Sequence, residues 1–375
     1  MTVTPLFVYG SFGHGNLGDE LVPDCLAAAL NAAGYPATPI PVTRFDGDLT
    51  WPGVINRSAA PARLAEAGGR LIVTGGGIVE PRAHSCMNRA FDLAATVPGT
   101  AVDAFAFSVE PGVDFGWRDR RRLRRQLDQI GTAHVRDELS AETLLRLAPG
   151  HPVRVVGDIA LWSAAGTLPD AVTALLSGAG TGIAVILQTT WDKTEVFPWL
   201  VPELVTLARE LDLPVTILPF AAHDDRDRKM HSSLAAALRE AAPDRAVADL
   251  SALLPGVLTP AVAAALLEQA ELTISTRLHG CVLSYAMKTP FVALSYHPKL
   301  AGFARTVDRQ SALLPARPPS RQSARYGYSF ADLGLRPGDL VARAGEVLDD
   351  RDFPAIAFYR RRQAQVLGDM LRSER

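Results

Sequence analysis

Lysine and cysteine are both scarce in this chain of 375 residues. Lysine occurs only at positions 193, 229, 288 and 299, so arginine carries nearly all of the positive charge. The three cysteines, Cys25, Cys86 and Cys281, are isolated and form no C-x-x-C pair. This spacing indicates neither a disulfide framework nor a thiolate zinc site, and it fits a reducing compartment.

A surplus of one charge and a long apolar run are also missing. The net charge is −2, which argues against a dedicated nucleic-acid binder, because such a protein carries a basic surplus on one face. No basic segment precedes the first apolar strand, and no apolar run approaches the length of a membrane span. We therefore expect a cytoplasmic protein without a signal peptide or a transmembrane helix.

The length and the pattern of the chain predict two domains. With 48% hydrophobic residues, the chain can bury two ordinary cores and is too long for one typical domain. Strand-like runs alternate with helical patterns between residues 5 and 156, and again between residues 182 and 295. This βα repetition predicts an α/β protein with two parallel sheets, each covered on both faces. The stretch 163–182, rich in Ala, Gly and Thr, is expected to be the linker.

The expected boundaries follow from this pattern. We predict an N-terminal Rossmann-like domain over residues 1–165 and a C-terminal one over residues 180–305. Residues 306–375 are expected to form a loop, rich in Arg, Ser and Pro over residues 309–329, followed by two helices. The last helix, from about residue 354 to 371, has apolar residues at helical spacing and is predicted to pack back on the N-terminal domain.

A glycine-rich turn follows the first apolar strand, residues 5–9. Three glycines in it have the spacing G-x-G-x-x-G: Gly13, Gly15 and Gly18. A dinucleotide site also needs an acidic residue after the second strand, and here that strand is followed by Thr43 and Arg44. Asp19 and Glu20, in the first turn of the next helix, would repel a pyrophosphate and suit sugar hydroxyls. The turn therefore favours a sugar over NAD.

A second polar turn follows the strand formed by residues 271–275. It places Arg277 and His279 two residues apart, before a helix that is expected to open at Gly280. Backbone N–H groups at a helix start and an arginine together favour an anion, held here beside a titratable imidazole. The alternative is that Arg277 and His279 only cap and fill the edge of a sheet.

Three further motifs each allow two interpretations. The triple glycine Gly75–Gly77 gives either an unobstructed backbone beside a bound group or a plain tight turn. Arg136, which follows a strand, either contacts a ligand or forms a surface salt bridge. The run from His223 to Asp227 either ligates a metal or stabilises the start of a helix through its acids.

The arginine-rich run and the tryptophans are also ambiguous. The run from Arg118 to Arg125 is either a solvated helix face or a surface attracted to anionic lipid headgroups. Trp162, Trp191 and Trp199 either stack on a sugar ring or belong to the core.

Several motifs occur in a characteristic order along the chain. They are Gly13-x-Gly15-Asn16-x-Gly18-Asp19-Glu20, the triple glycine, Val135-Arg136-Asp137-x-x-Ser140, Gly157-Asp158-Ile159-Ala160-Leu161, Arg277-Leu278-His279-Gly280, and Phe291 to Lys299. In this order they resemble the polysaccharide pyruvyl transferase family, over roughly residues 5 to 305. One departure is His297, where the family usually has an acidic or amide residue before Pro-Lys.

The resemblance implies a fold similar to the two-domain GT-B type, with the active site in the cleft between two Rossmann-like halves. The implied reaction transfers the enolpyruvyl carbons of phosphoenolpyruvate to two hydroxyls of one sugar, which gives a cyclic pyruvate ketal and free phosphate. The acceptor would be lipid-linked or part of a cell-envelope polysaccharide, and the protein would work in the cytoplasm or at the inner face of the membrane. The scheme requires neither a metal nor a cofactor.

The resemblance also implies roles for particular residues. Arg277, Arg136 and the helix start at Gly280 would clamp the phosphate and the carboxylate of phosphoenolpyruvate. His279 would perform the acid/base chemistry. Asp19 and Asn16 would hold or activate the acceptor hydroxyls. The other implied substrate-binding residues are Gly13, Gly15, Gly75, Gly76, Gly77, Leu278 and Lys299.

Two other functions stay open on sequence alone. A nucleotide-sugar glycosyltransferase of the same architecture would use Arg277 and His279 to bind a diphosphate leaving group. A non-catalytic sugar- or nucleotide-binding protein would use the same residues without chemistry. Release of free phosphate from phosphoenolpyruvate distinguishes the pyruvyl transferase from both.

Overall fold

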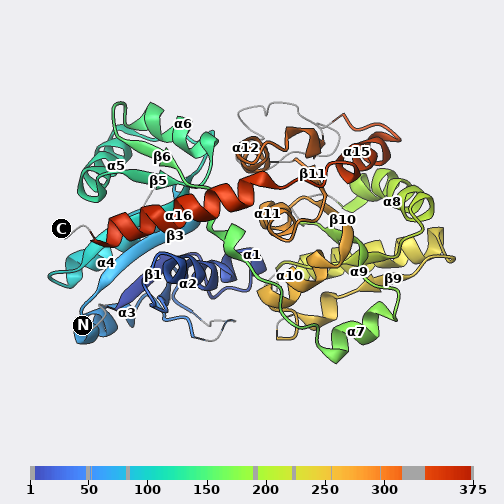
Figure 1. Cartoon of the computed structure of the whole chain (residues 1–375), viewed down its shortest axis with the longest axis horizontal. Helices are drawn as coiled ribbons and strands as arrows, with labels where there is room; N and C mark the ends of the chain where they lie inside the picture. The colour runs from blue at the N-terminus through green and yellow to red at the C-terminus, as the bar shows by residue number, and fades with distance from the viewer. Residues whose placement is uncertain are drawn as a thin grey trace. The chain divides into compact units, whose positions relative to one another are not determined.

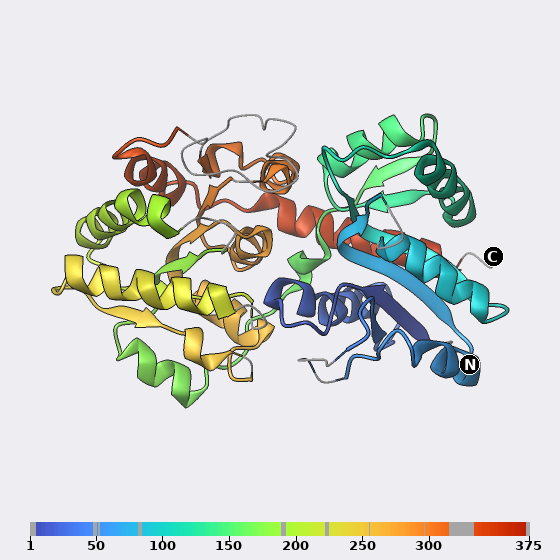
Figure 2. The same ribbon diagram turned by 180° about the vertical axis from the view of Figure 1, so that it is seen from behind.

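The structure is a computed structural model that describes residues 5–47, 51, 53–81, 85–188, 193–221, 225–254, 256–295, 297–314 and 334–372. The chain forms two compact units, each of which is drawn as a ribbon in Figures 1 and 2. Unit 1 comprises Met1–Trp162 and Ala355–Arg375, and unit 2 comprises Ser163–Pro354.

Unit 1 is built on a parallel sheet of six strands in the order β2-β1-β3-β4-β5-β6. Its strands are β1 (Leu6–Gly10), β2 (Ile40–Thr43), β3 (Arg70–Val79), β4 (Ala101–Val109), β5 (Ala133–Val135) and β6 (Val153–Val155). Its helices are α1 (Leu17–Glu20), α2 (Val22–Ala32), α3 (Ala60–Ala67), α4 (Cys86–Thr96), α5 (Trp117–Ile130), α6 (Glu138–Leu147), the 3-10 helix η1 (Ile159–Trp162) and α16 (Pro354–Arg372).

Unit 2 is built on a second parallel sheet of six strands, in the order β12-β11-β10-β7-β8-β9. Its strands are β7 (Gly182–Ile186), β8 (Val215–Ile217), β9 (Val247–Asp249), β10 (Ala270–Ser275), β11 (Phe291–Leu294) and β12 (Leu313–Leu314). Its helices are α7 (Asp170–Leu176), α8 (Lys193–Glu210), α9 (Asp225–Ala241), α10 (Pro260–Glu268), α11 (Leu278–Ala286), α12 (Pro298–Thr306), α15 (Asp339–Leu348) and the 3-10 helices η2 (Ser251–Leu253) and η3 (Gln310–Ala312).

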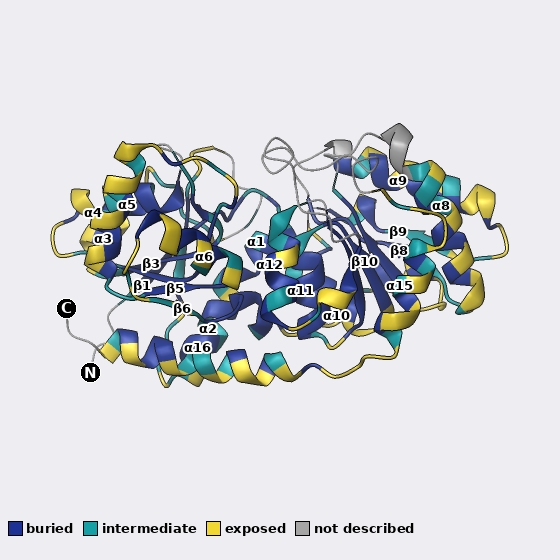
Figure 3. Ribbon diagram, turned by 90° about the horizontal axis from the view of Figure 1, so that it is seen from above, coloured by how far each residue is buried: buried dark blue, intermediate teal, exposed yellow. Residues whose placement is uncertain are grey.

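One inner strand of each sheet is buried along its whole length. Every residue of β1 and of β7 is buried, and Figure 3 shows β1 in dark blue. A parallel strand that is covered on both faces by helices reads as a continuous apolar run, because no face is left for polar residues. This explains why the sequence pattern of these strands does not alternate.

Helix α16 returns to unit 1 after the chain has completed unit 2. Figures 1 and 2, seen from opposite sides, place it across one face of the first sheet and α4 on the other face. The buried Gln363 side chain donates to the carbonyl oxygens of Gly157 and Asp158, both at 3.1 Å, and accepts a hydrogen bond from the Trp162 indole at 2.6 Å. A side chain at Gly157 would meet the Tyr359 ring, so a glycine is required there.

Three details differ from the sequence-based expectations. The stretch 163–182 contains helix α7 and belongs to unit 2, so it is more than a linker. Strand β3 runs through the triple glycine and ends only at Val79. Helix α11 begins at Leu278, two residues before Gly280. Most of the expected loop over residues 309–329 lies outside the described residues.

Candidate active site

Each sheet has one point at which its strand order reverses direction. In unit 1 this point lies between β1 and β3, and in unit 2 it lies between β7 and β10. Loops that leave the carboxyl ends of two such strands diverge, and open α/β sheets bind their ligands in the space between them. The glycine-rich turn follows β1 and Arg277 follows β10, so both sequence-predicted motifs lie at these points.

In unit 1, the glycine-rich turn is already filled by a carboxylate of the chain itself. Glu20 accepts hydrogen bonds from the backbone N–H groups of Gly13, His14 and Gly15, at 2.9 to 3.0 Å. Gly13 and Gly15 both have a φ of 81°, which directs these N–H groups to one point. A pyrophosphate would need the same donors. The turn is thus an internal capping motif, which argues against a pyrophosphate at this position and leaves the expected sugar a prediction.

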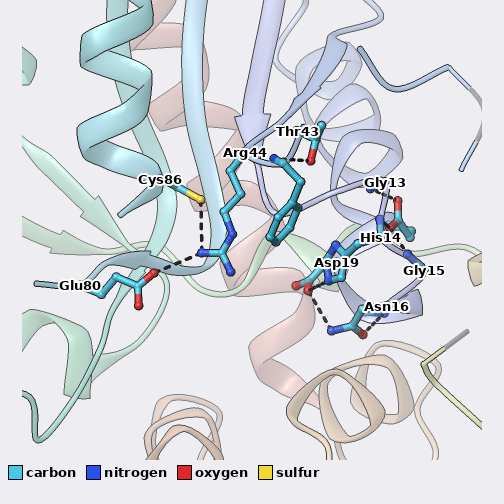
Figure 4. A network of polar contacts seen from close by, with 12 residues as sticks. Gly13, His14, Gly15, Asn16, Asp19, Thr43, Arg44, Glu80 and Cys86 are labelled. Carbon is cyan, nitrogen blue, oxygen red and sulfur yellow. Dashed lines mark hydrogen bonds and ion pairs between the residues drawn. The ribbon is translucent and has the colours of Figure 1, made fainter. Parts of the chain in front are cut away.

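Asp19 is held by its neighbours in the position where the turn meets α1. The Asn16 side chain donates to Asp19 Oδ2 at 2.8 Å, while Asn16 Oδ1 accepts from the N–H of Gly18 at 3.2 Å and so caps α1. His14 Nε2 lies 3.6 Å from the same Asp19 oxygen. Figure 4 shows this cluster of Asn16, Asp19 and His14. A carboxylate fixed in this way can accept hydrogen bonds from hydroxyl groups or take a proton from one.

Arg136 is the buried cation of unit 1. It follows β5 and is only 3% exposed. Its Nε donates to Asp137 at 2.9 Å, and its Nη1 lies 3.6 Å from an oxygen of Asp158. Burial favours a lower pKa for Arg136, but Asp137 and Asp158 outweigh burial and raise it, so the guanidinium stays protonated. Among the described residues, neither Nη1 nor Nη2 has a hydrogen-bond partner.

The triple glycine lies beside both Asp19 and Arg136. A methyl group built on Gly76 would lie 3.2 Å from Arg136 Nη1 and 3.9 Å from Asp19 Oδ1. The bare backbone at Gly76 therefore leaves room beside both groups. Gly75 and Gly77 have φ values of 98° and 61°, which other residues rarely adopt, and the N–H of Gly77 donates to the Ser108 hydroxyl at 2.8 Å.

Arg44 is a residue near this cluster to which the sequence analysis assigned no role. Its guanidinium lies 3.2 Å from a Glu80 oxygen, 3.9 Å from Cys86 Sγ and over the Phe45 ring, as Figure 4 shows for the labelled Arg44, Glu80 and Cys86. Burial raises the pKa of the Cys86 thiol to about 11, so Cys86 is a neutral thiol and no nucleophile. The position of Arg44 directly after β2 was the available sequence signal.

In unit 2, a serine at the end of β10 shapes the turn that carries Arg277. Ser275 Oγ accepts from the N–H of Arg277 at 3.0 Å and donates to its carbonyl oxygen at 2.8 Å. A Cβ on Gly280 would collide with this hydroxyl at 2.3 Å, so Gly280 is required by close packing. Arg277 is the N-cap residue of α11, and Leu278, His279 and Gly280 form the first turn of that helix.

The Arg277 side chain is oriented by two partners. Its Nη2 forms an ion pair with Asp227, a carboxylate with no exposed surface, and its Nε donates to the carbonyl oxygen of Leu187 at 3.2 Å. Leu187 directly follows β7, so this contact crosses the reversal point of the second sheet. The guanidinium is thus fixed by α9 and by the end of β7 before any ligand arrives.

His231 lies one helical turn beyond Asp227 on α9 and is completely buried. Burial lowers the pKa of His231 to about 4. The positive charge of Arg277 lowers this pKa further, whereas the negative charge of Asp227 opposes the change. The imidazole is therefore neutral at physiological pH. The sequence analysis noted Asp227 only within the run from His223 and did not consider His231, although their spacing of four residues on one helix was a usable signal. His223 and Asp224 lie outside the described residues.

The remaining predicted residues of unit 2 lie at the same edge of the sheet. Strands β10 and β11 are neighbours, with Ser275 opposite Ala293, so α11 and α12 begin side by side. His279 is 9% exposed, and Lys299 is in the first turn of α12. His297 caps α12 by accepting the N–H of Lys299 on its Nδ1 at 3.2 Å.

The predicted site residues thus form two groups. Gly13, Gly15, Asn16, Asp19, Gly75, Gly76, Gly77 and Arg136 belong to unit 1, whereas Arg277, Leu278, His279, Gly280 and Lys299 belong to unit 2. Of the tryptophans, Trp162 binds Gln363, and the Trp199 indole donates to the carbonyl oxygen of Arg336 at 3.0 Å; Trp191 lies outside the described residues. Within the described part of the chain, no three His, Cys, Asp or Glu side chains are grouped as metal ligands.

The search for membrane-crossing segments covers the same residues. No helix in them is both long enough and apolar enough to cross a bilayer.

Comparisons with known proteins agree with this architecture. The sequence model of a family described as polysaccharide pyruvyl transferase matches residues 16–298. No curated protein sequence gives a significant match.

Several solved structures share the fold. The UDP-GlcNAc 2-epimerase of Methanocaldococcus jannaschii has a TM-score of 0.56 at 11% identity, with 94% of this chain and 96% of that chain covered. A putative UDP-N-acetylglucosamine 2-epimerase of Listeria monocytogenes has a TM-score of 0.55 at 10% identity, covering 96% and 91%. The trehalose-6-phosphate synthase OtsA has a TM-score of 0.50 at 11% identity, covering 99% of each. At such identities the likeness shows the fold alone, and it confirms the expected α/β, GT-B-like class.

Proposed function

The chain belongs to the polysaccharide pyruvyl transferase family, and we propose that it forms a pyruvate ketal on a sugar, with phosphoenolpyruvate as the donor. The observation that carries this proposal is the position of Arg277 at the start of α11, beside His279. The ion pair with Asp227 of α9 holds the Arg277 guanidinium in place. The same observation favours a compact anion as the ligand of unit 2, because an oriented guanidinium and the N–H groups of a helix start converge there.

The donor binds in unit 2 in this proposal. Arg277 holds the carboxylate or the phosphate, the first turn of α11 supplies N–H groups, and Lys299 adds a second positive charge at the same edge. His279 delivers the proton to the methylene carbon of phosphoenolpyruvate, which leaves an oxocarbenium-like centre at the adjacent carbon. A first sugar hydroxyl adds to that carbon, and a second then displaces phosphate. The hydroxyls supply two protons, of which one replaces the proton given by His279 and the other leaves with phosphate.

The acceptor sugar binds in unit 1 in this proposal. Asp19 accepts hydrogen bonds from its hydroxyls and takes a proton from the attacking one, while Asn16 keeps the carboxylate in place. The Nη groups of Arg136 donate to sugar oxygens. The sequence analysis expected Arg136 to clamp phosphoenolpyruvate, but two aspartates already neutralise its charge, which suits neutral hydroxyls better than a second anion.

The test measures free phosphate and product mass together. Purified protein is incubated with phosphoenolpyruvate and a panel of methyl glycosides and oligosaccharides. We expect acceptor-dependent phosphate release and a product with the mass of a pyruvate ketal. A transferase that uses nucleotide sugars would release no phosphate from phosphoenolpyruvate, and a binding protein would release none from any donor.

Donor binding can be tested without knowledge of the acceptor. At about 100 times its dissociation constant, phosphoenolpyruvate should stabilise the protein by about 2.7 kcal/mol in a thermal melt. Arg277→Ala should lose this protection, whereas the control Arg209→Ala, which changes an exposed arginine of α8, should keep it. A melting shift with UDP-sugars and none with phosphoenolpyruvate would reverse the assignment.

A further inference from the structure

Helix α5 concentrates positive charge on unit 1. It contains six arginines and two aspartates within Trp117–Ile130, a net charge of +4 in a chain whose net charge is −2. Five of the six arginines are exposed: Arg118, Arg120, Arg121, Arg124 and Arg125. Only Arg122 forms an ion pair within the described part of the chain, with Asp92 at 2.6 Å. Like charges at helical spacing repel one another, so an unpaired row of them favours an anionic partner.

The exposed side of α5 also carries a tryptophan. The buried side chains Leu123, Leu127 and Ile130 face the core of unit 1. Trp117, Arg121 and Arg124 follow one another at spacings of four and three residues and therefore share the opposite face. Trp117 is 68% exposed, and the Arg118 guanidinium lies 5.3 Å from the centre of its ring. Figure 3 shows this side of α5 as exposed. Tryptophan beside arginine is typical of helices that lie at the surface of a bilayer.

A cavity of about 500 Å³ extends the basic face between α4, the start of β4 and α5. Arg122 and Arg125 line it, together with the apolar Phe91 and Val102. Gln126, also in its lining, is 5% exposed, and its Oε1 accepts no hydrogen bond from any described residue. Asp92 also lines the cavity and pairs with Arg122, so Arg125 is the lining guanidinium without an ion pair among the described residues. This guanidinium and an amide oxygen in need of a donor match a phosphodiester that carries hydroxyl groups. The headgroup of phosphatidylglycerol has this chemistry.

We propose that the exposed face of α5 is a docking surface for an anionic bilayer. Trp117 enters the headgroup region, the arginine row binds lipid phosphates, and the cavity between α4 and α5 receives a hydroxyl-bearing headgroup. A nucleic acid is a poorer match, because Trp117 is the single aromatic side chain of α5 and the chain as a whole is acidic. The proposal is independent of the pyruvyl transfer reaction, since no residue of α5 belongs to the candidate site.

Cosedimentation with vesicles tests the proposal. The full chain is mixed with vesicles of phosphatidylcholine and phosphatidylglycerol, or of phosphatidylcholine alone. We expect binding to the anionic vesicles only, weakened by high salt. The double variant Arg121→Glu and Arg124→Glu should reduce vesicle affinity by about tenfold or more, because each arginine near an anionic surface contributes to binding. The control Arg209→Glu and Arg239→Glu gives the same net charge with exposed residues of unit 2, and it should bind like the wild type.

Trp117 provides a second readout. Anionic vesicles should shift the tryptophan fluorescence of the wild type to shorter wavelength, and Trp117→Phe should bind the vesicles but lose the shift. Inorganic phosphate at millimolar concentration should not displace the protein, since a free ion cannot replace the row of contacts. Equal loss of binding in both double variants would overturn the proposal. So would binding to RNA or heparin without binding to anionic vesicles, or no vesicle binding by the folded wild type.

Discussion

Units 1 and 2 share an architecture but differ in the charge at the edge of the sheet where the parallel strands end. In unit 1, the guanidinium of Arg136 faces Asp137 and Asp158, Asp19 borders the same space at Gly76, and the nearby Arg44 is paired with Glu80. In unit 2, Arg277 faces one carboxylate, Asp227, and Lys299 begins the neighbouring helix. The first edge therefore carries a surplus of negative charge and the second does not.

This difference is the reason why the proposed function gives the two edges different ligands. The reversal of strand order creates a binding position in both sheets, but it says nothing of the ligand's chemistry. A phosphate and a carboxylate would be repelled by the acids of unit 1, whereas neutral hydroxyls can use both its acceptors and the donors of Arg136. The backbone N–H groups of the glycine-rich turn in unit 1 are also unsuited to an anion, because they already donate to Glu20. In the proposed function, local charge rather than fold therefore distinguishes the acceptor side from the donor side.

The largest expected effect comes from His279. His279→Ala should lower kcat by about a hundredfold or more, because a positioned acid/base group is lost, with little change in the affinity for phosphoenolpyruvate. Steady-state kinetics and a thermal melt measure the two quantities separately. Folded His279→Ala protein with undiminished turnover would remove the catalytic role from unit 2.

The second prediction compares how a substitution at each edge changes the affinity for phosphoenolpyruvate. Arg277→Ala should weaken phosphoenolpyruvate binding by about ten- to a hundredfold, since a charge-assisted hydrogen bond is lost, and Arg277→Lys should restore it only in part. Gly76→Ala, whose methyl group would occupy the space beside Arg136 and Asp19, should leave donor affinity unchanged and raise the KM of the acceptor. Calorimetric titration with phosphoenolpyruvate is the measurement. Equal loss of donor affinity in Arg277→Ala and Gly76→Ala would show that the edges share one ligand.

A third prediction concerns folding stability at acid pH, where unit 2 should lose more stability than unit 1. His231 has a folded-state pKa of about 4, below its ordinary value of 6.5, so the unfolded chain binds more protons between these two pH values. Stability should therefore fall as the pH drops below about 6.5, and this group alone should cost about 2 kcal/mol at pH 5 relative to pH 8.

Urea unfolding of wild type and His231→Phe at pH 5 and pH 8 isolates that contribution. The variant should lose less stability at pH 5 than the wild type. His151→Phe in unit 1 is the control, because His151 is only partly buried and its pKa is lowered to a lesser extent. An unchanged pH dependence in His231→Phe would mean that the acid sensitivity of unit 2 has another source.

The features that could be predicted from sequence are those that depend on neighbouring residues. The alternation of strands and helices, the glycine turn after β1 and the cluster from Arg277 to Gly280 are local patterns, and the fold class they indicate is confirmed. Helix α11 could also be predicted from local sequence. Its actual start lies two residues before the predicted one, because Arg277 precedes it in place of a capping Ser, Thr, Asp or Asn.

The features that were missed depend on contacts that form only in the folded chain. Asp227 and Leu187 meet Arg277 only because β10 lies beside β7, and no pattern within α9 announces that neighbour. The carboxylate of Glu20 was read as repelling a ligand, whereas it folds back onto the N–H groups of its own turn. In both cases a charged side chain has a partner that the sequence pattern does not identify, namely the end of another strand and another helix for Arg277 and the backbone of its own turn for Glu20.

The smallest expected effect concerns His297 and sharpens the assignment of Lys299 to the donor side. His297 stands where the family usually has an acidic or amide residue, and its Nδ1 accepts the N–H of Lys299 at 3.2 Å as the cap of α12. Asp and Asn are the better caps, so His297→Asn should keep stability and donor affinity, while His297→Ala should cost about 1 kcal/mol and fray the turn that carries Lys299. Thermal melts and the KM for phosphoenolpyruvate, measured on both variants, give the answer. If His297→Asn impairs donor binding as much as His297→Ala, then the imidazole contacts the donor itself; if only His297→Ala does, then His297 acts through the position of Lys299.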